Sequence, residues 1–213
     1  RYILQISKAI LANMQGMPSF YKIKEKKVSY SAYQEINIRM NTLTFHITDI
    51  ASNSVRAGAT RILLEIAINE ENTTIRIADN GCGMDAETIA QVTDPFYTTR
   101  TTRKVGLGIP FLIQNAEQTG GFVKISSQPG VGTEVTACFI TANIDCPPWG
   151  DLPGTVAMLI SGNPEINVCF SYKKGEQLFE VSTEELRTVF EDIPLSHPKV
   201  ILAIKEMIAE NLA

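Results

Sequence analysis

Three glycine pairs punctuate the middle of this 213-residue chain, and their order constrains its fold more than any other feature of the sequence. The pairs are Gly81-x-Gly83, Gly106-x-Gly108 and Gly130-x-Gly132. None of them matches the phosphate-binding P-loop, which ends in Gly-Lys-Ser/Thr, or the six-residue dinucleotide fingerprint. Each pair taken alone is typical of a turn, so its meaning depends on the elements around it.

The first glycine pair directly follows two predicted strands. Apolar and polar residues alternate over 61–68 and over 73–78, which predicts a strand at each place. A helix is predicted over 42–57 because its apolar residues recur at helical spacing. The polar residues of this helix share a separate stripe, which comprises Thr42, His46, Asp49, Asn53 and Arg56. We interpret His46 as a histidine on the surface of this helix.

The remaining sequence predicts further elements and three parts. The elements are helices over 85–92 and 110–118, a strand pair over 122–127 and 133–140, a hairpin over 155–160 and 166–172, a strand over 177–181, and helices that begin near Ser182 and Ser196. The parts are an N-terminal basic extension over 1–39 with a helix and an arm, a central domain over 40–144, and a C-terminal hairpin with helices over 145–213 that flanks or extends it. The N-terminal extension carries seven basic and two acidic residues.

Composition argues against several classes of protein. The formal net charge is −4, which argues against a general nucleic-acid binder. No apolar run approaches the length of a membrane span. The four cysteines contain no Cys-x-x-Cys pair, which argues against a zinc site, and they are too few for a disulfide scaffold in a chain of this length. We therefore expect a cytoplasmic protein that binds neither nucleic acid nor membrane.

The series of motifs resembles the GHKL superfamily, which includes gyrases, heat-shock chaperones, histidine kinases and mismatch-repair ATPases. The resemblance covers about residues 42–140, from the polar-striped helix through the loop Asp79-Asn80-Gly81-Cys82-Gly83 to Gly132-Thr133. It implies the Bergerat ATP-binding fold, an α+β two-layer sandwich with a mixed, mainly antiparallel sheet and helices on one face. It also implies binding of ATP and Mg²⁺. The C-terminal residues resemble the tails of small, stand-alone bacterial ATP-binding proteins of this superfamily.

The helix over 42–57 matches the first motif of the superfamily. An acid lies there four residues before an Asn, so that both share one helix face. The resemblance implies that Asn53 supplies a side-chain oxygen to Mg²⁺ and that Asp49 orients or deprotonates the attacking nucleophile. The hydrolytic members carry Glu in place of Asp49, and Asp is one methylene shorter. Arg56 matches a basic position that approaches the phosphates in histidine kinases. A solvated helix face is the alternative for these three residues.

The loop after the second strand matches the adenine-binding motif. The resemblance implies that the Asp79 carboxylate accepts a hydrogen bond from the adenine amino group, and that Gly81 and Gly83 let the backbone approach the base. Thr133 matches the last motif and is expected near the adenine, joined to Asp79 through water. A plain hairpin turn is the alternative for Gly130-x-Gly132.

Residues 94–108 resemble the ATP lid of histidine kinases. The resemblance implies that the backbone of Gly106, Leu107 and Gly108, at the start of the next helix, contacts phosphate. The candidates for contact with the γ-phosphate are Thr99, Arg100 and Lys104. A solvated loop is the alternative for the basic side chains.

We expect a regulatory kinase that transfers the γ-phosphoryl group of ATP to a protein partner. Two alternatives stay open: a slow ATPase whose lid closure switches partner binding, and a nucleotide-dependent binding module with little turnover. The identity of the partner or phosphoacceptor stays open, as does the formation of a homodimer.

Overall fold

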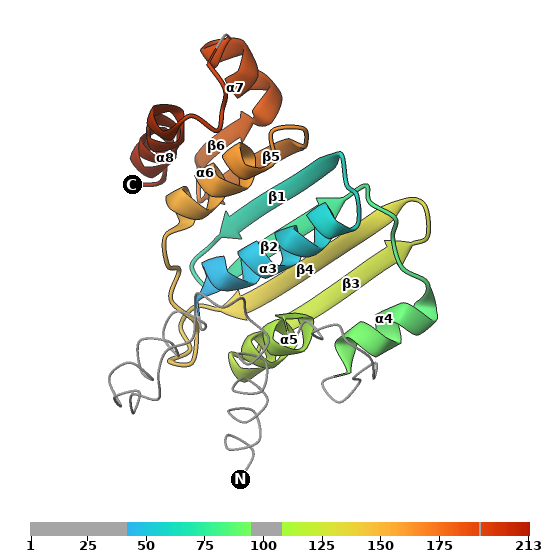
Figure 1. Cartoon of the computed structure of the whole chain (residues 1–213). Helices are drawn as coiled ribbons and strands as arrows, with labels where there is room; N and C mark the ends of the chain where they lie inside the picture. Colours follow the sequence, from blue (N-terminus) through green and yellow to red (C-terminus); the bar gives the residue numbers. More distant parts are fainter. Residues whose placement is uncertain (1–41, 95–107, 192) are drawn as a thin grey trace, which may run out of the picture. The chain divides into compact units, whose positions relative to one another are not determined.

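The computed structural model describes residues 42–94, 108–191 and 193–213, which all belong to one compact unit. Figure 1 shows its elements along the chain. They are α3 (Leu43–Arg56), β1 (Arg61–Ile68), β2 (Asn72–Asp79), α4 (Ala86–Thr93), α5 (Gly108–Gln118), β3 (Phe122–Gln128), β4 (Gly132–Ile140), α6 (Leu152–Gly162), β5 (Asn167–Lys174), β6 (Gln177–Ser182), α7 (Thr183–Phe190) and α8 (Pro198–Leu212).

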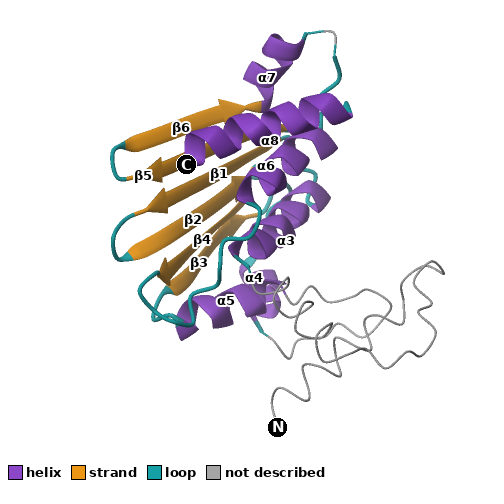
Figure 2. Ribbon diagram, turned by 90° about the vertical axis from the view of Figure 1, so that its left-hand side faces the viewer, coloured by secondary structure: helices purple, strands orange, loops and turns teal. Residues whose placement is uncertain are grey.

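The strands form one six-stranded sheet in the order β3-β4-β2-β1-β5-β6. Strands β1 and β5 are parallel, and every other neighbouring pair in this sheet is antiparallel. Helices α3, α5, α6 and α8 lie on one face, as Figure 2 shows. The predicted α+β sandwich, with a mixed and mainly antiparallel sheet covered by helices on one face, is therefore confirmed.

The hydrophobic core lies between this sheet face and its helices. Alternate residues of each strand point inward, and Ile62, Leu64 and Ile66 of β1 are at most 1% exposed. The opposite face carries polar side chains, among them Arg76, which donates hydrogen bonds to Glu65 and Glu134 on the neighbouring strands. This alternation explains why period-two patterns predicted the strands.

The predicted strand over 155–160 is wrong, because these residues belong to helix α6. The Asp151 side chain caps this helix by accepting from the Gly154 N–H, and Pro153 fits its first turn. Its buried residues recur at helical spacing: Leu152, Val156, Ala157, Ile160 and Ser161. A short apolar run does not by itself distinguish a strand from a helix, and Pro153-Gly154 resembles a break in the chain. The C-terminal hairpin is instead formed by β5 and β6.

Within the described ranges, no helix is both long enough and apolar enough to cross a membrane.

The parallel pairing of β1 with β5 predicts that the described unit unfolds as a whole. Phe170 of β5 is 1% exposed and contacts Phe179 of β6. We expect Phe170→Ala to destabilise the protein by about 3–5 kcal/mol and to lower a single thermal transition. Phe122→Ala is the control, because Phe122 is 43% exposed on the edge strand β3. Two calorimetric transitions, of which Phe170→Ala lowers one, would contradict this prediction and indicate a separate C-terminal domain.

Candidate functional site

Helix α3 presents the polar stripe from a rigid base. Thr42 caps its N-terminus, since its hydroxyl accepts a hydrogen bond from the Phe45 N–H at 3.1 Å. Its apolar stripe is buried against the sheet, with Leu43 and Ile47 each 1% exposed. The helix ends before Gly58, whose φ of +73° is a left-handed conformation that favours glycine. The burial of the apolar stripe fixes the direction of the polar one.

The Asp79 carboxylate lies at the end of β2 and is held from two sides. Ser54 of α3 donates a hydrogen bond to Oδ2 at 2.6 Å, and the Gly81 N–H donates to Oδ1 at 2.9 Å. A Cβ on Gly81 would lie 2.8 Å from the Cβ of Ala57, so only glycine fits there without a shift. Each carboxylate oxygen retains a lone pair, so the group can still accept hydrogen bonds from a ligand.

The loop after Asp79 is fastened to the turn between β3 and β4. Gly83 has a φ of +66°, and a Cβ there would lie 2.0 Å from the carbonyl oxygen of Gln128. The Ser127 hydroxyl accepts from the Met84 N–H at 2.7 Å and lies 2.8 Å from the Thr133 hydroxyl. Thr133 is the partner of Asp79 in the pairing of β2 with β4. The predicted adenine-site residues Asp79, Gly81, Gly83 and Thr133 are therefore brought together.

The Asp49 carboxylate meets the first residue of α5. A Cβ on Gly108 would lie 1.4 Å from Oδ2 of Asp49, so a side chain at position 108 would require the Asp49 carboxylate to move. Burial raises the pKa of the Asp49 carboxyl, and the nearby charge of Arg56 offsets part of that rise. A carboxylate whose pKa is raised toward the working pH is a better proton acceptor than an ordinary surface carboxylate.

The side chains of Asn53 and Arg56 contact each other at the end of α3. The Arg56 guanidinium donates a hydrogen bond to Oδ1 of Asn53, the oxygen predicted to bind Mg²⁺. Arg56 is exposed, so its hydrogen bond to Asn53 contributes little to stability. The guanidinium can therefore leave this oxygen easily. The polar stripe of α3 therefore places a carboxylate, an amide oxygen and a cation side by side.

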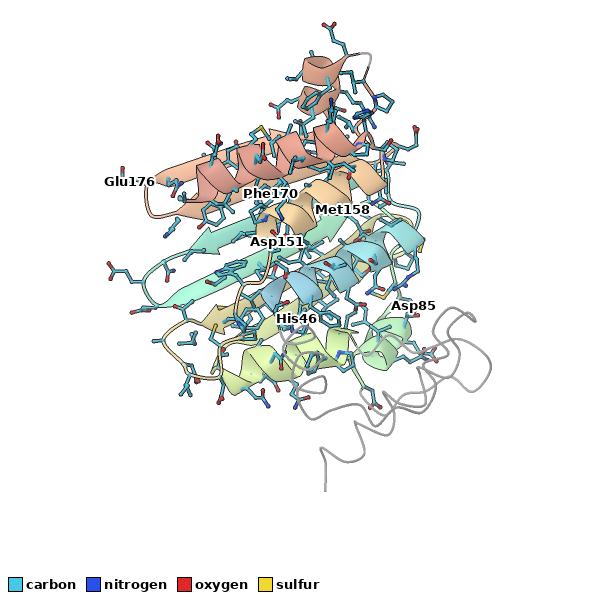
Figure 3. All side chains as sticks on the ribbon, turned by 60° about the vertical axis from the view of Figure 1, so that its left-hand side comes forward. His46, Asp85, Asp151, Met158, Phe170 and Glu176 are labelled. Carbon is cyan, nitrogen blue, oxygen red and sulfur yellow. The ribbon has the colours of Figure 1, made fainter. Side chains whose placement is uncertain are left out.

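The interpretation of His46 as a surface histidine is wrong. His46 is 2% exposed, and its Nε2 lies 2.9 Å from Nδ2 of Asn115 on α5. Its ring packs against Phe45 and Phe111, with centroid distances of 5.8 and 5.4 Å. The sequence-based interpretation assumed that the whole polar stripe of α3 faces solvent. In the structure, helix α5 covers the part of this stripe that carries His46. Figure 3 shows His46 between these two helices.

Five predicted phosphate-site residues lie outside the described residues: Thr99, Arg100, Lys104, Gly106 and Leu107. Their roles stay predictions. Two hydroxyl groups that the structure brings to the site, those of Ser54 and Ser127, are missing from the prediction. Each serine ends a series of apolar residues on the inward face of its helix or strand. A polar residue at such a position needs a hydrogen-bond partner inside the protein. This change from apolar to polar is the sequence signal that points to them.

Comparisons with known proteins agree with this geometry. Residues 40–143 match the family model described as histidine kinase-, DNA gyrase B- and HSP90-like ATPase. The sensor histidine kinase YxdK of Bacillus subtilis is 28% identical over 129 residues, covering 54% of this chain and 40% of YxdK. The signal transduction histidine-protein kinase AtoS of Escherichia coli is 32% identical over 105 residues, covering 47% of this chain and 17% of AtoS. This chain therefore spans less than half the length of these two relatives.

The buried His46 predicts a loss of stability in mild acid. Burial lowers its pKa from 6.5 to about 4, so the unfolded chain binds the proton more readily between these values. We expect the contribution to be complete above pH 6.5, to fall as the pH drops, and to level off below about pH 4, at a total loss of about 3 kcal/mol.

Unfolding by urea across this pH range measures the effect. His46→Gln, which keeps a polar group without the titration, should flatten the pH dependence. His197→Asn is the matched control, because His197 is the second histidine of the chain and is exposed at the N-cap of α8. An equal pH dependence in the parent and in His46→Gln would contradict the prediction.

Proposed function

We propose that this chain, whose residues 40–143 match the model of the histidine kinase-, DNA gyrase B- and HSP90-like ATPase family, is a Mg²⁺-dependent regulatory kinase that transfers the γ-phosphoryl group of ATP to a protein partner. The family implies ATP binding. The observation that carries the proposal is the Asp79 carboxylate, held by Ser54 and Gly81 beside Thr133, one helix face away from Asp49 and Asn53. Helix α3 thus carries Asp49 and Asn53, which are proposed for the phosphate end, and its Ser54 contacts Asp79, which is proposed to bind the base.

Recognition of the base is assigned to the end of β2. The adenine amino group is a donor, and the Asp79 carboxylate offers acceptor capacity beyond its two bonds to the chain. Because Ser54 and Gly81 already fix the carboxylate, little side-chain entropy is lost when the base binds. Thr133 is assigned a water-mediated role at the same position, supported by its pairing with Asp79.

The metal is assigned to Asn53. Its amide oxygen is a hard ligand of the kind that Mg²⁺ accepts, and it would hold the ion together with the phosphates of the nucleotide. Among the described residues, no three His, Cys, Asp or Glu side chains cluster as a metal site. When bound, Mg²⁺ neutralises phosphate charge. Arg56, which contacts Asn53 here, is assigned to the phosphates and would leave Asn53 if that oxygen held the ion.

Asp49 is assigned to the attacking hydroxyl or imidazole of the phosphoacceptor. Its position against Gly108, with a raised pKa, supports a role in accepting or orienting a proton. Gly106, Leu107 and Gly108 are assigned to the phosphates through their backbone N–H groups, and Thr99, Arg100 and Lys104 to the γ-phosphate.

A slow ATPase switch is the second candidate function. The motif sequence from Asp49 to Gly83 favours it, because it resembles the mismatch-repair pattern, although the hydrolytic members carry Glu in place of Asp49. The relatives YxdK and AtoS carry the word histidine kinase in their names, which supports phosphotransfer to histidine as the first candidate. The partner protein is proposed to supply that histidine, or a serine, and the state of oligomerisation is left to experiment.

Asp79→Asn should weaken ATP binding by about 10- to 100-fold, because hydrogen bonds to charged groups contribute about 1.5–3 kcal/mol. Isothermal titration calorimetry with ATP, with Mg²⁺ or with EDTA, measures the affinity and its metal dependence. Asp145→Asn is the matched control, since Asp145 is exposed on the loop before α6. An Asp79→Asn protein that remains folded and binds ATP as tightly as the parent would refute the base-recognition assignment.

Asp49→Asn should retain ATP affinity and lose phosphoryl transfer by about 100-fold or more, the usual contribution of a positioned base. Incubation with Mg²⁺ and γ-labelled ATP follows free phosphate and labelled protein together. Acid-labile label indicates a histidine target, acid-stable label a serine target, and free phosphate alone the ATPase switch. Equal turnover in Asp49→Asn and the parent would remove Asp49 from the chemistry.

A further inference from the structure

The interface between α3 and α5 contains a buried polar pair in otherwise apolar surroundings. His46 is 2% and Asn115 4% exposed, and Nε2 of the first lies 2.9 Å from Nδ2 of the second. With Asn115 donating, the neutral imidazole carries its proton on Nδ1. Among the described residues, that buried nitrogen has no hydrogen-bond partner. An apolar pair of similar volume would avoid this cost, so the polar pair must be explained by something other than stability.

The same two helices meet at the phosphate end of the site. Gly108, the first residue of α5, packs on the Asp49 carboxylate so closely that a Cβ would lie 1.4 Å from Oδ2. Asp49 lies one turn beyond His46 on α3, and Asn115 lies two turns beyond Gly108 on α5. The two contacts therefore belong to one helix–helix interface and depend on a single relative position of α3 and α5.

The apolar contacts of this interface define that position less sharply than a hydrogen bond does. Ile47 and Leu112 are buried there, and they line a cavity of about 10 Å³ together with His46. Apolar contacts are non-directional and tolerate a slide of one helix along the other, whereas a hydrogen bond requires a defined distance and angle. The rings of Phe45 and Phe111 hold the imidazole plane, which fixes the direction of the hydrogen bond.

We propose that His46 and Asn115 form a register pair, which sets the position of the first residue of α5 against the Asp49 carboxylate. His46 is thus a positioning residue for the phosphate end of the site, and this inference rests on the proposed function. Single buried polar residues are known to fix the register of apolar helix interfaces at a cost in stability. A misplacement of about 1 Å at a reacting group lowers a rate by as much as 100-fold, so such a device has a catalytic use.

The test compares the parent with His46→Leu, Asn115→Leu and the double variant His46→Leu/Asn115→Leu. Each single variant removes one side of the hydrogen bond between His46 and Asn115 and should lower the melting temperature. The double variant should recover most of that loss. The pKa of the Asp49 carboxyl is then followed by ¹³C NMR in nucleotide-free protein. We expect it to be raised in the parent and to move toward its ordinary value in the double variant, as water reaches a carboxylate that α5 no longer covers.

Two further variants separate register from general packing. His46→Gln keeps an acceptor for Asn115 and should keep the raised pKa of Asp49. Leu112→Met changes an apolar residue of the same interface without a polar group and should leave that pKa unchanged. A stable double variant with the parent's Asp49 pKa would overturn the proposal, as would an equal shift in Leu112→Met. Calorimetry with ATP is run on the parent first, since a failure to bind would refute the proposed function and leave the NMR result intact.

Discussion

The hydrogen bond from Ser54 to Asp79 joins helix α3 to the end of strand β2, and the arrangement of the candidate site depends on it. Ser54 belongs to the buried side of α3, whereas Asp49 and Asn53 belong to its polar stripe. The bond therefore fixes the rotation of α3 relative to β2. Because the Gly81 N–H holds the second carboxylate oxygen, the loop that follows is positioned by the same group.

Glycines make this joint compact. Gly81 allows the loop to pack on Ala57 at the end of α3, and Gly132 allows the turn before β4 to pack on the backbone of Asp79, since a Cβ there would lie 1.9 Å from the Asp79 carbonyl oxygen. The helix, the loop and the hairpin thus converge within van der Waals distance around one carboxylate. A side chain at either position would separate two of these elements, so the glycines act here through space as well as through backbone freedom.

The C-terminal residues extend this frame without contributing to the predicted site. Strand β5 continues the sheet beside β1, and α6 and α8 continue the helical layer. The N–H of Leu43 donates to the carbonyl of Pro148, so the chain just before α6 also fixes the start of α3. The segment beyond the matched residues 40–143 therefore supports the site-bearing helix α3.

The sequence by itself determined the order and type of most elements, because alternating strands such as β1 and helices with one apolar stripe such as α3 are local periodic patterns. The resemblance of its motifs to the GHKL superfamily also predicted Asp79, Gly81, Gly83 and Thr133 as one group. Tertiary structure decided what local patterns leave open: that 155–160 forms a helix, and that α5 covers His46 and places Gly108 on Asp49. These outcomes depend on which surfaces meet. The contacts His46–Asn115 and Asp49–Gly108 join residues 69 and 59 positions apart in the chain, and such contacts leave no periodic trace in the sequence.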